Sequence, residues 1–291
     1  MNEFQHILVR RHADIVFLTL NQPATRNALS PEMVAEIDGA IAGIGRDASV
    51  RALVLRGSQG FFCAGGNVGN FKSRLDASAS GEGEACAAAG DPVAARNREF
   101  GRFMTRLSNL PIPVLAVVES AAMGGGMGLA CAADIVLATR DARFALSETG
   151  LGLVPAQIAP FVVGRLGARV ARRLGLTGER VRGETAMQLG LVDELASDGA
   201  ALDSLLAEWL TRICACAPHA NAHIKPLFDD CAGPDSADAL DRAALRFARC
   251  MRDEGGEGIA AFREKRPPAW ARRILADDVR RACATTLEES A

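Results

Sequence analysis

The sequence predicts an α/β fold with a helical C-terminal region, and three observations support this prediction. Short apolar runs rich in Val, Ile and Leu are typical of buried strands, and they occur at residues 15–20, 53–55, 114–118 and 135–138. Helical stretches precede or follow these runs, which favours strands covered on both faces. From Asp198 onward, apolar residues recur at helical spacing alone. We therefore expect an α/β core over residues 1–197 and a helical region over residues 198–291.

The first helix has a recognisable beginning and a recognisable buried face. Ser30 and Pro31 are residue types preferred at the N-cap and at the first helical position. Four apolar residues then fall on one face, namely Met33, Ile37, Ile41 and Ile44. By contrast, residues 71–100 contain a long stretch that is small, polar and aperiodic, which predicts a long mobile loop.

Composition excludes several classes of function. The chain has 291 residues and a net charge of −2 with both signs interspersed, so nothing favours a nucleic-acid partner. No apolar run is long enough to span a bilayer, and no signal-peptide core is present, so we expect no membrane partner. Eight scattered cysteines without paired spacing favour a reduced, cytoplasmic protein. The four histidines lie outside every motif below, and we expect no metal.

Two glycine-rich turns each follow a predicted strand. Residues 64–66 (AGG) follow one strand, and residues 124–126 (GGG) lie between another strand and an Ala-rich helical segment. At a helix N-terminus, free backbone N–H groups and the helix dipole both favour an anionic oxygen. Two such N–H groups aimed at one point form an oxyanion hole.

A single carboxylate lies in an apolar segment farther along the chain. Residues 144–155 read FALSETGLGLVP, and Glu148 is their only charged residue. Apolar surroundings raise the pKa of a carboxylate, which suits proton transfer. Glu148 is therefore the candidate acid and base.

Taken together, these motifs resemble the crotonase (enoyl-CoA hydratase/isomerase) superfamily over residues 7–270. The motifs that carry the resemblance are AGGN (64–67), GGGMGL (124–129), SETGLGLVP (147–155) and LTGERVRGETAMQLGLVDEL (176–195). The resemblance implies a crotonase-like spiral of ββα units, and C-terminal helices that build a homotrimer or a dimer of trimers. It also implies an acyl-CoA substrate, with coenzyme A as part of that substrate and no further cofactor.

The resemblance assigns roles to particular residues. The backbone N–H groups of Gly66 and Gly125 would hold the thioester oxygen while the α-carbon gains enolate character. Contacts to coenzyme A are expected from Arg26, Ala28, Ala64, Phe262 and Lys265. The last two commonly reach coenzyme A from a neighbouring subunit.

The number of carboxylates bears on the reaction. A typical hydratase of this superfamily places two glutamates around one water, and this chain has Glu148 in one position but Gly128 in the other. With one glutamate, a double-bond isomerase is chemically natural and stays an alternative. Residues 147–163, however, are similar to the hydratases of 3-methylglutaconyl-CoA and of its isohexenyl relative. We therefore expect hydration of a 3-branched glutaconyl-CoA.

A protein without catalysis that binds coenzyme A or serves in assembly is the alternative of another class. The intact glycines and Glu148 argue against it.

A glutaconyl substrate carries a distal carboxylate, which needs a cation when buried. Five candidate cations lie in or beside the predicted loop, namely Lys72, Arg74, Arg96, Arg98 and Arg102, and we take Arg96 first. Asn67 is a further candidate contact to a substrate oxygen or water, although capping its own turn is an alternative role.

Overall fold

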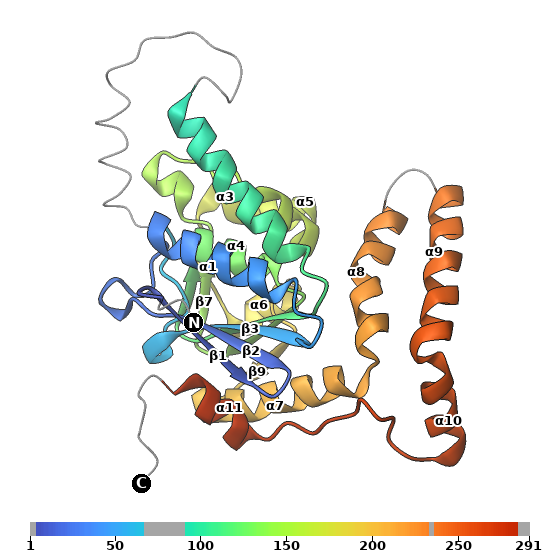
Figure 1. Cartoon of the computed structure of the whole chain (residues 1–291). Coiled ribbons are helices and arrows are strands. Elements are labelled where there is room, and N and C mark those ends of the chain that lie inside the picture. The colour runs from blue at the N-terminus through green and yellow to red at the C-terminus, as the bar shows by residue number, and fades with distance from the viewer. Residues whose placement is uncertain (1–3, 67–90, 233–235, 285–291) are drawn as a thin grey trace.

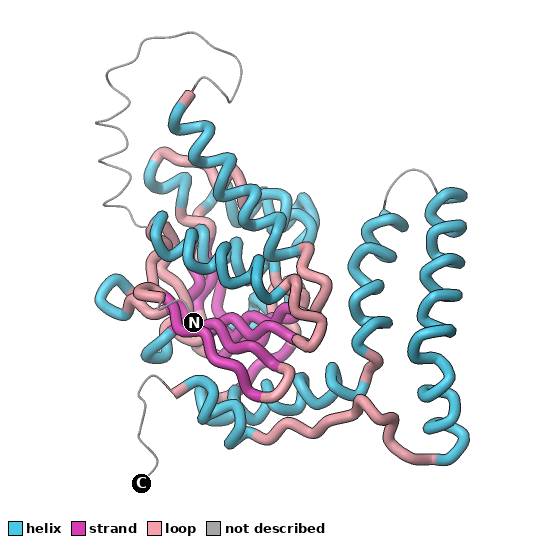
Figure 2. The backbone as a smooth tube through the Cα atoms, viewed as in Figure 1, coloured by secondary structure: helices cyan, strands magenta, loops and turns pink. Residues whose placement is uncertain are grey.

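The structure, a computed structural model, describes residues 4–66, 91–232 and 236–284. Figure 1 shows an α/β core with a pair of long helices beside it, and Figure 2 shows that the strands are gathered in the middle of the core. Asn67, Lys72, Arg74 and residues 71–90 of the predicted loop lie outside the described residues.

The main sheet has six strands in the order β1-β2-β3-β4-β6-β9. β1 is antiparallel to β2, and every other pair is parallel. The strands are β1 (Ile7–His12), β2 (Ile15–Leu20), β3 (Ala52–Gly57), β4 (Val114–Val118), β6 (Ile135–Thr139) and β9 (Glu194–Ala196). The four apolar runs predicted as strands all lie in this sheet, so those predictions are confirmed.

Both faces of the sheet are buried under helices. Successive side chains of a strand point to opposite faces, so each strand contributes to both clusters. In β2, Val16 and Leu18 pack with one cluster, which includes residues of α1 (Pro31–Ile44), α4 (Gly125–Ala132) and α5 (Ala159–Thr177). Ile15 and Phe17 pack with the opposite cluster, beneath α7 (Gly199–Ala215) and α11 (Ala276–Cys283). This two-sided burial explains why the strands are continuously apolar.

A second layer of short strands runs beside the main sheet. It contains β5 (Ala121–Met123), β7 (Arg143–Ala145) and β8 (Val181–Arg182), with β5 parallel to β7. Single parallel bridges extend this layer, joining Cys63 to Ala122 and Leu29 to Gly66. The chain repeatedly visits the main sheet, then this layer, then a helix, which is the predicted ββα repeat.

The first residues of two helices bear on predictions made from the sequence. In α1, the Ser30 hydroxyl accepts a hydrogen bond from the Met33 N–H at 3.1 Å, as the N-cap prediction requires. The predicted loop over 71–100 is wrong at its end, because α3 (Pro92–Ser108) begins there. Asp91 caps this helix by accepting from the N–H groups of Val93 and Ala94.

The C-terminal region is helical but divided between two places. α7 begins after its N-cap Asp198 and packs on the main sheet, together with α11. Between them in sequence, α8 (Pro218–Ala232), α9 (Ser236–Cys250) and α10 (Gly256–Glu264) form an arm at the side of the core (Figure 1). A five-residue π-helix, Met251–Gly255, joins α9 to α10. A short helix, α6 (Gly183–Gln188), lies against β8 and β9.

Candidate active site

The predicted catalytic groups follow neighbouring strands of the second layer. Gly66 follows the segment that pairs with β5, Gly125 follows β5, and Glu148 follows β7. Carboxyl ends of adjacent parallel strands meet at one edge, where ligands of α/β proteins commonly bind. The topology thus gathers three groups that lie far apart in the sequence.

Gly66 and Gly125 lie close together. The Gly66 nitrogen is 3.9 Å from the point where a Cβ on Gly125 would stand. Gly125 is the first residue of α4, so its N–H has no partner four residues earlier in the helix. Within the described residues, no oxygen accepts a hydrogen bond from either N–H. Two free donors lying close together are the groups from which an oxyanion hole can be built.

A glycine is required at the turn before α4. Gly124 has φ 48° and ψ −119°, a conformation that L side chains rarely adopt. Its N–H donates to the Ala145 oxygen at 2.8 Å, which ties the turn to the end of β7. The turn therefore holds the start of α4 beside the segment that carries Glu148.

The Glu148 carboxylate lies directly against this turn. Its Oε1 atom is 2.8 Å from the point where a Cβ on Gly124 would stand. Its Oε2 atom is buried and has no hydrogen-bond partner within the described residues. Burial raises the pKa of Glu148 above its ordinary value. Glu148 therefore lies beside the glycine turn with a carboxyl group that holds its proton more tightly than an exposed glutamate does.

The segment predicted to line coenzyme A is joined to the first glycine turn. The Ala64 N–H donates to the Arg26 oxygen at 3.0 Å, and the Leu29 N–H donates to the Gly65 oxygen at 2.7 Å. Ala28 is buried between these two bonds. The exposed Arg26 guanidinium lies 5.9 Å from the ring centre of Phe61, which holds the cation near the turn. The structure thus brings Arg26, Ala28 and Ala64 together.

Asn27 organises this junction, and sequence reasoning gave it no role. It is fully buried with φ 55°. Its amide nitrogen donates to the Phe61 oxygen at 2.6 Å and the Ser58 oxygen at 3.2 Å, and its amide oxygen accepts from the Gln22 N–H at 2.8 Å. The available signal was the residue type, because asparagine tolerates the left-handed region and bonds to nearby backbone.

Some predicted contacts do not reach the site within one chain. Phe262 and Lys265 lie at the end of α10 on the arm, and Phe262 is 86% exposed.

Arg96 lies on α3, one helical turn before Phe100. The Phe100 ring comes within 3.8 Å of the Cβ point on Gly125. Arg96 is therefore on the face of α3 that borders the two glycines.

Gly128 lies buried in α4 and packs against Ile158. It presents no carboxylate, so Glu148 stands alone among the residues gathered here. Sequence reasoning did not single out Ile158, because only the fold brings it onto α4.

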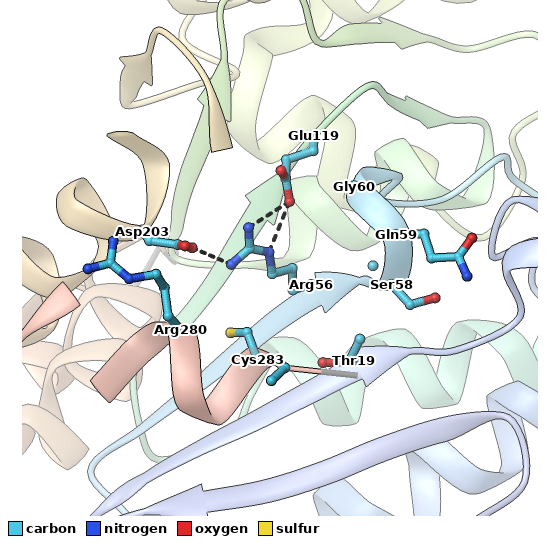
Figure 3. Close-up of a pocket in the computed structure, with 11 residues that line it drawn as sticks. Thr19, Arg56, Ser58, Gln59, Gly60, Glu119, Asp203, Arg280 and Cys283 are labelled. Atoms are coloured by element: carbon cyan, nitrogen blue, oxygen red, sulfur yellow. Dashed lines mark hydrogen bonds and ion pairs between the residues drawn. The ribbon is translucent and has the colours of Figure 1, made fainter. Parts of the chain in front are cut away.

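A polar cavity of about 240 Å³ lies elsewhere, between the end of β3 and α11 (Figure 3). Arg56 crosses it and donates to Glu119 and Asp203. None of the predicted site residues lines this cavity. In the described part of the chain, no group of His, Cys, Asp and Glu side chains is arranged to hold a metal. Nor is any described helix both long enough and apolar enough to cross a membrane.

Comparison with known proteins agrees with this geometry. The family model of enoyl-CoA hydratase/isomerase matches residues 10–273. The solved structure of Pseudomonas aeruginosa AtuE is 42% identical, with a TM-score of 0.85 and coverage of 92% of this chain and 100% of that one. An enoyl-CoA hydratase/isomerase from Marinobacter aquaeolei is 40% identical, with a TM-score of 0.84 and coverage of 92% and 99%.

Among curated relatives, the Escherichia coli 1,2-epoxyphenylacetyl-CoA isomerase is 30% identical over 274 residues, covering 93% of this chain and 99% of that protein. The match to the family model spans nearly the whole chain and includes Gly66, Gly125 and Glu148. The chain belongs to the enoyl-CoA hydratase/isomerase family.

Proposed function

We propose that this chain is an enoyl-CoA hydratase that adds water to a 3-branched glutaconyl-CoA, such as methylglutaconyl- or isohexenylglutaconyl-CoA. One observation carries the proposal: the half-buried carboxylate of Glu148, whose Oε2 atom has no hydrogen-bond partner within the described residues, lies against the turn that carries the free N–H of Gly125, close to Gly66. The N–H groups would hold the thioester oxygen, and the carboxylate would move one proton.

The steps balance with one carboxylate. Glu148 takes a proton from water as the water oxygen bonds to the β-carbon of the enoyl group. The electron pair of the double bond moves toward the thioester, whose oxygen becomes an enolate held by the N–H groups of Gly66 and Gly125. Glu148 then gives its proton to the α-carbon, which completes the addition of water and restores the carboxylate.

The branched glutaconyl substrate is the finer part of the proposal, and the arginines of α3 support it. Arg102 pairs with Glu99, and Arg106 pairs with Asp38. Within the described residues, Arg96 and Arg98 have no carboxylate partner. The Arg98 Nη1 atom lies 2.9 Å from the Cβ point on Gly101, where the Gln157 side chain of the Glu148 loop also lies. One free cation, Arg98, thus lies beside Gln157, in the segment that follows Glu148.

The arginines are tested by substitution. Arg96→Gln or Arg98→Gln should lower the preference for a glutaconyl thioester over crotonyl-CoA by about 10- to 100-fold in kcat/KM, because a charge-assisted hydrogen bond is lost. Arg102→Gln is the matched control, since Arg102 already has Glu99. If both test variants keep the preference of the wild type, the distal carboxylate is held by other groups.

Isomerisation is the second candidate, favoured by the glycine at position 128. Glu148 alone could remove a proton at one carbon and return it two carbons away, without water. A loss of conjugated-enoyl absorbance with the glutaconyl thioester, abolished in Glu148→Ala, supports hydration. A gain of that absorbance from a 3-enoyl-CoA supports isomerisation. Binding of acyl-CoA with neither change supports the non-catalytic alternative.

We also propose a homotrimer or dimer of trimers, in which Phe262 and Lys265 complete a neighbour's coenzyme A site. Their position on the exposed arm supports this assembly. Coenzyme A enters as part of the substrate, and the steps above need no other cofactor. A cytoplasmic location is in keeping with the free thiols of the seven described cysteines.

A further inference from the structure

Two glycines on one face of α4 receive side chains from the same loop. Gly128 donates its N–H to the Gly124 oxygen at 3.0 Å, so the two residues are one helical turn apart on the same face. The Glu148 carboxylate lies against Gly124, and Ile158 lies against Gly128. The loop from Glu148 to Ile158 therefore touches α4 at both of its ends.

The contact at Gly128 leaves no room for a side chain. A Cβ on Gly128 would stand 2.3 Å from Ile158 Cγ2 and 2.7 Å from Ile158 Cβ. These atoms belong to the stiff, branched base of the isoleucine, which cannot swing aside as the end of a long side chain can. Ile158 is 3% exposed, so it has no empty space to move into.

The backbone around Ile158 is also held. The Ala159 N–H donates to the Pro155 oxygen at 2.9 Å, and the Val162 N–H donates to the Ile158 oxygen at 3.1 Å. Relief of a clash at Gly128 would require the start of α5 to shift. At Gly124, in contrast, the contacting atom is the carboxylate end of Glu148.

We propose that Ile158 is a specificity-determining residue that restricts this site to one acid–base carboxylate. It fills the space that a side chain at position 128 would occupy, one helical turn from Gly124, where the Glu148 carboxylate makes its contact. This inference rests on the proposed function for its catalytic meaning, although the packing on which it depends does not.

Thermal unfolding tests the packing without reference to activity. Gly128→Ala should lower Tm by about 5 °C or more in the wild-type chain, because overpacking distorts the core. In the Ile158→Gly background, which also removes the Ile158 Cβ 2.7 Å from that point, the same substitution should lower Tm little or raise it, because alanine favours a helix. Gly39→Ala is the matched control, since Gly39 lies inside α1 with no atom within 4 Å of its Cβ point. An equal loss in both backgrounds would overturn the proposal.

Product analysis tests the catalytic consequence. In the Ile158→Gly background, Gly128→Glu should raise the ratio of hydration to double-bond migration by about 10-fold or more, because a second carboxylate can hold the water. Without the change at Ile158, Gly128→Glu should lose activity instead. An unchanged ratio in the Ile158→Gly background contradicts the proposal. Absence of turnover in the wild type would defeat the proposed function, while the Tm cycle would still decide whether Ile158 closes position 128.

Discussion

Glu148 is held where its ionised form is disfavoured, and this has a consequence for stability. Its ordinary pKa is 4.5, and burial raises the pKa in the folded chain. The folded state therefore binds this proton more tightly than the unfolded state does. The stabilising contribution of the protonated group is complete below the ordinary pKa and is lost as pH rises through the folded value.

It follows that Glu148→Gln should raise Tm at pH 7 to 8, because a half-buried charge is replaced by a neutral group of similar size. The gain in Tm should shrink toward pH 4, where the protonated Glu148 side chain is as neutral as the glutamine. Differential scanning calorimetry across this pH range measures it. Glu184→Gln is the control, since the Glu184 side chain is 67% exposed. A gain that is independent of pH would contradict the raised pKa as its cause.

The same pKa shift bears on catalysis. As a base, Glu148 must be ionised, so kcat/KM for hydration should fall on the acid side through a pKa above the ordinary range of a glutamate. Glu148→Gln should lower kcat by about 10³-fold or more, since proton transfer by a placed group contributes 10² to 10⁴. Stopped-flow absorbance of the enoyl chromophore measures both effects. An acid limb that persists in Glu148→Gln would assign it to another group.

The sequence predicts the place of some residues in the candidate site but not of others. Strand, turn and helix signals locate the two glycine turns and Glu148, and the family resemblance then selects Gly66 and Gly125 within those turns. Asn27 and Ile158 act through contacts with segments distant in the sequence, at Phe61 and at Gly128 respectively. Such contacts depend on tertiary packing, which no local pattern encodes.

Among the elements, the ends of β3 and β4 are joined to the C-terminal helices by a buried charge network. Arg56 donates to Glu119 at 2.8 and 2.9 Å, and to Asp203 of α7 at 2.5 Å (Figure 3). The three side chains are only 11 to 15% exposed. Burial alone would lower the pKa of Arg56, but the two carboxylates outweigh it and raise the pKa.

The network also borders the strands that precede Gly66 and Gly125. The backbone oxygen of Glu119 accepts a hydrogen bond from the Phe62 N–H at 3.1 Å. The Cys63 N–H donates to the backbone oxygen of Ala121 at 3.0 Å. These bonds align the segment before Gly66 with β5, which precedes Gly125. A shift of the backbone at Glu119 should therefore affect both glycine turns.

Arg56→Met should destabilise the chain by about 3–5 kcal/mol, because two buried carboxylates lose their cation. Arg140→Met is the matched control: Arg140 pairs with Glu184 at 2.9 Å with both side chains more than half exposed, so a loss of about 0–1 kcal/mol is expected. Urea unfolding compares the two variants. Similar losses would show that the Arg56 network contributes no more than an exposed pair.

The elements themselves follow the sequence where the signals are local and dense. The core strands are continuous apolar runs, and α1 has both a cap and an apolar stripe. The start of α3 is missed because Asp91 and Pro92 stand at the end of a long stretch of small polar residues. The buried stripe that fixes this helix lies farther on, at Phe103, Met104 and Leu107.

At the scale of the whole molecule, the arm formed by α8, α9 and α10 exposes apolar side chains that no other part of the described chain covers. Large apolar side chains on α8, α9 and α10 are more than 60% exposed, namely Phe228, Leu240, Leu245, Phe247 and Phe262. The arm is tied to the core by the Lys225 ammonium, which pairs with Asp134 at 2.7 Å. Exposed apolar side chains in this number are typical of an interaction surface, which supports the proposed homo-oligomer.

The helical spacing predicts that these residues lie on helices, but not where the arm points. Its direction depends on the bends after α7 and before α11, and on the contact of Lys225 with the core. For this reason the sequence alone could not say whether Phe262 and Lys265 reach the site of their own chain. They lie at the end of α10, which Figure 1 shows on the arm, apart from α4 in the core.

Complementation between two inactive variants tests the contribution of the neighbour. Glu148→Ala lacks the proton carrier but keeps the arm, and a Phe262→Ala/Lys265→Ala double variant keeps the carrier but lacks both arm residues. If the arm serves the next subunit in a ring, a site is intact when the double variant supplies its core and Glu148→Ala supplies its arm. In oligomers refolded from an equal mixture, about a quarter of all sites should then be active. If the arm served its own chain, the mixture would stay as inactive as its components, so recovery of activity at constant oligomer size distinguishes the two arrangements.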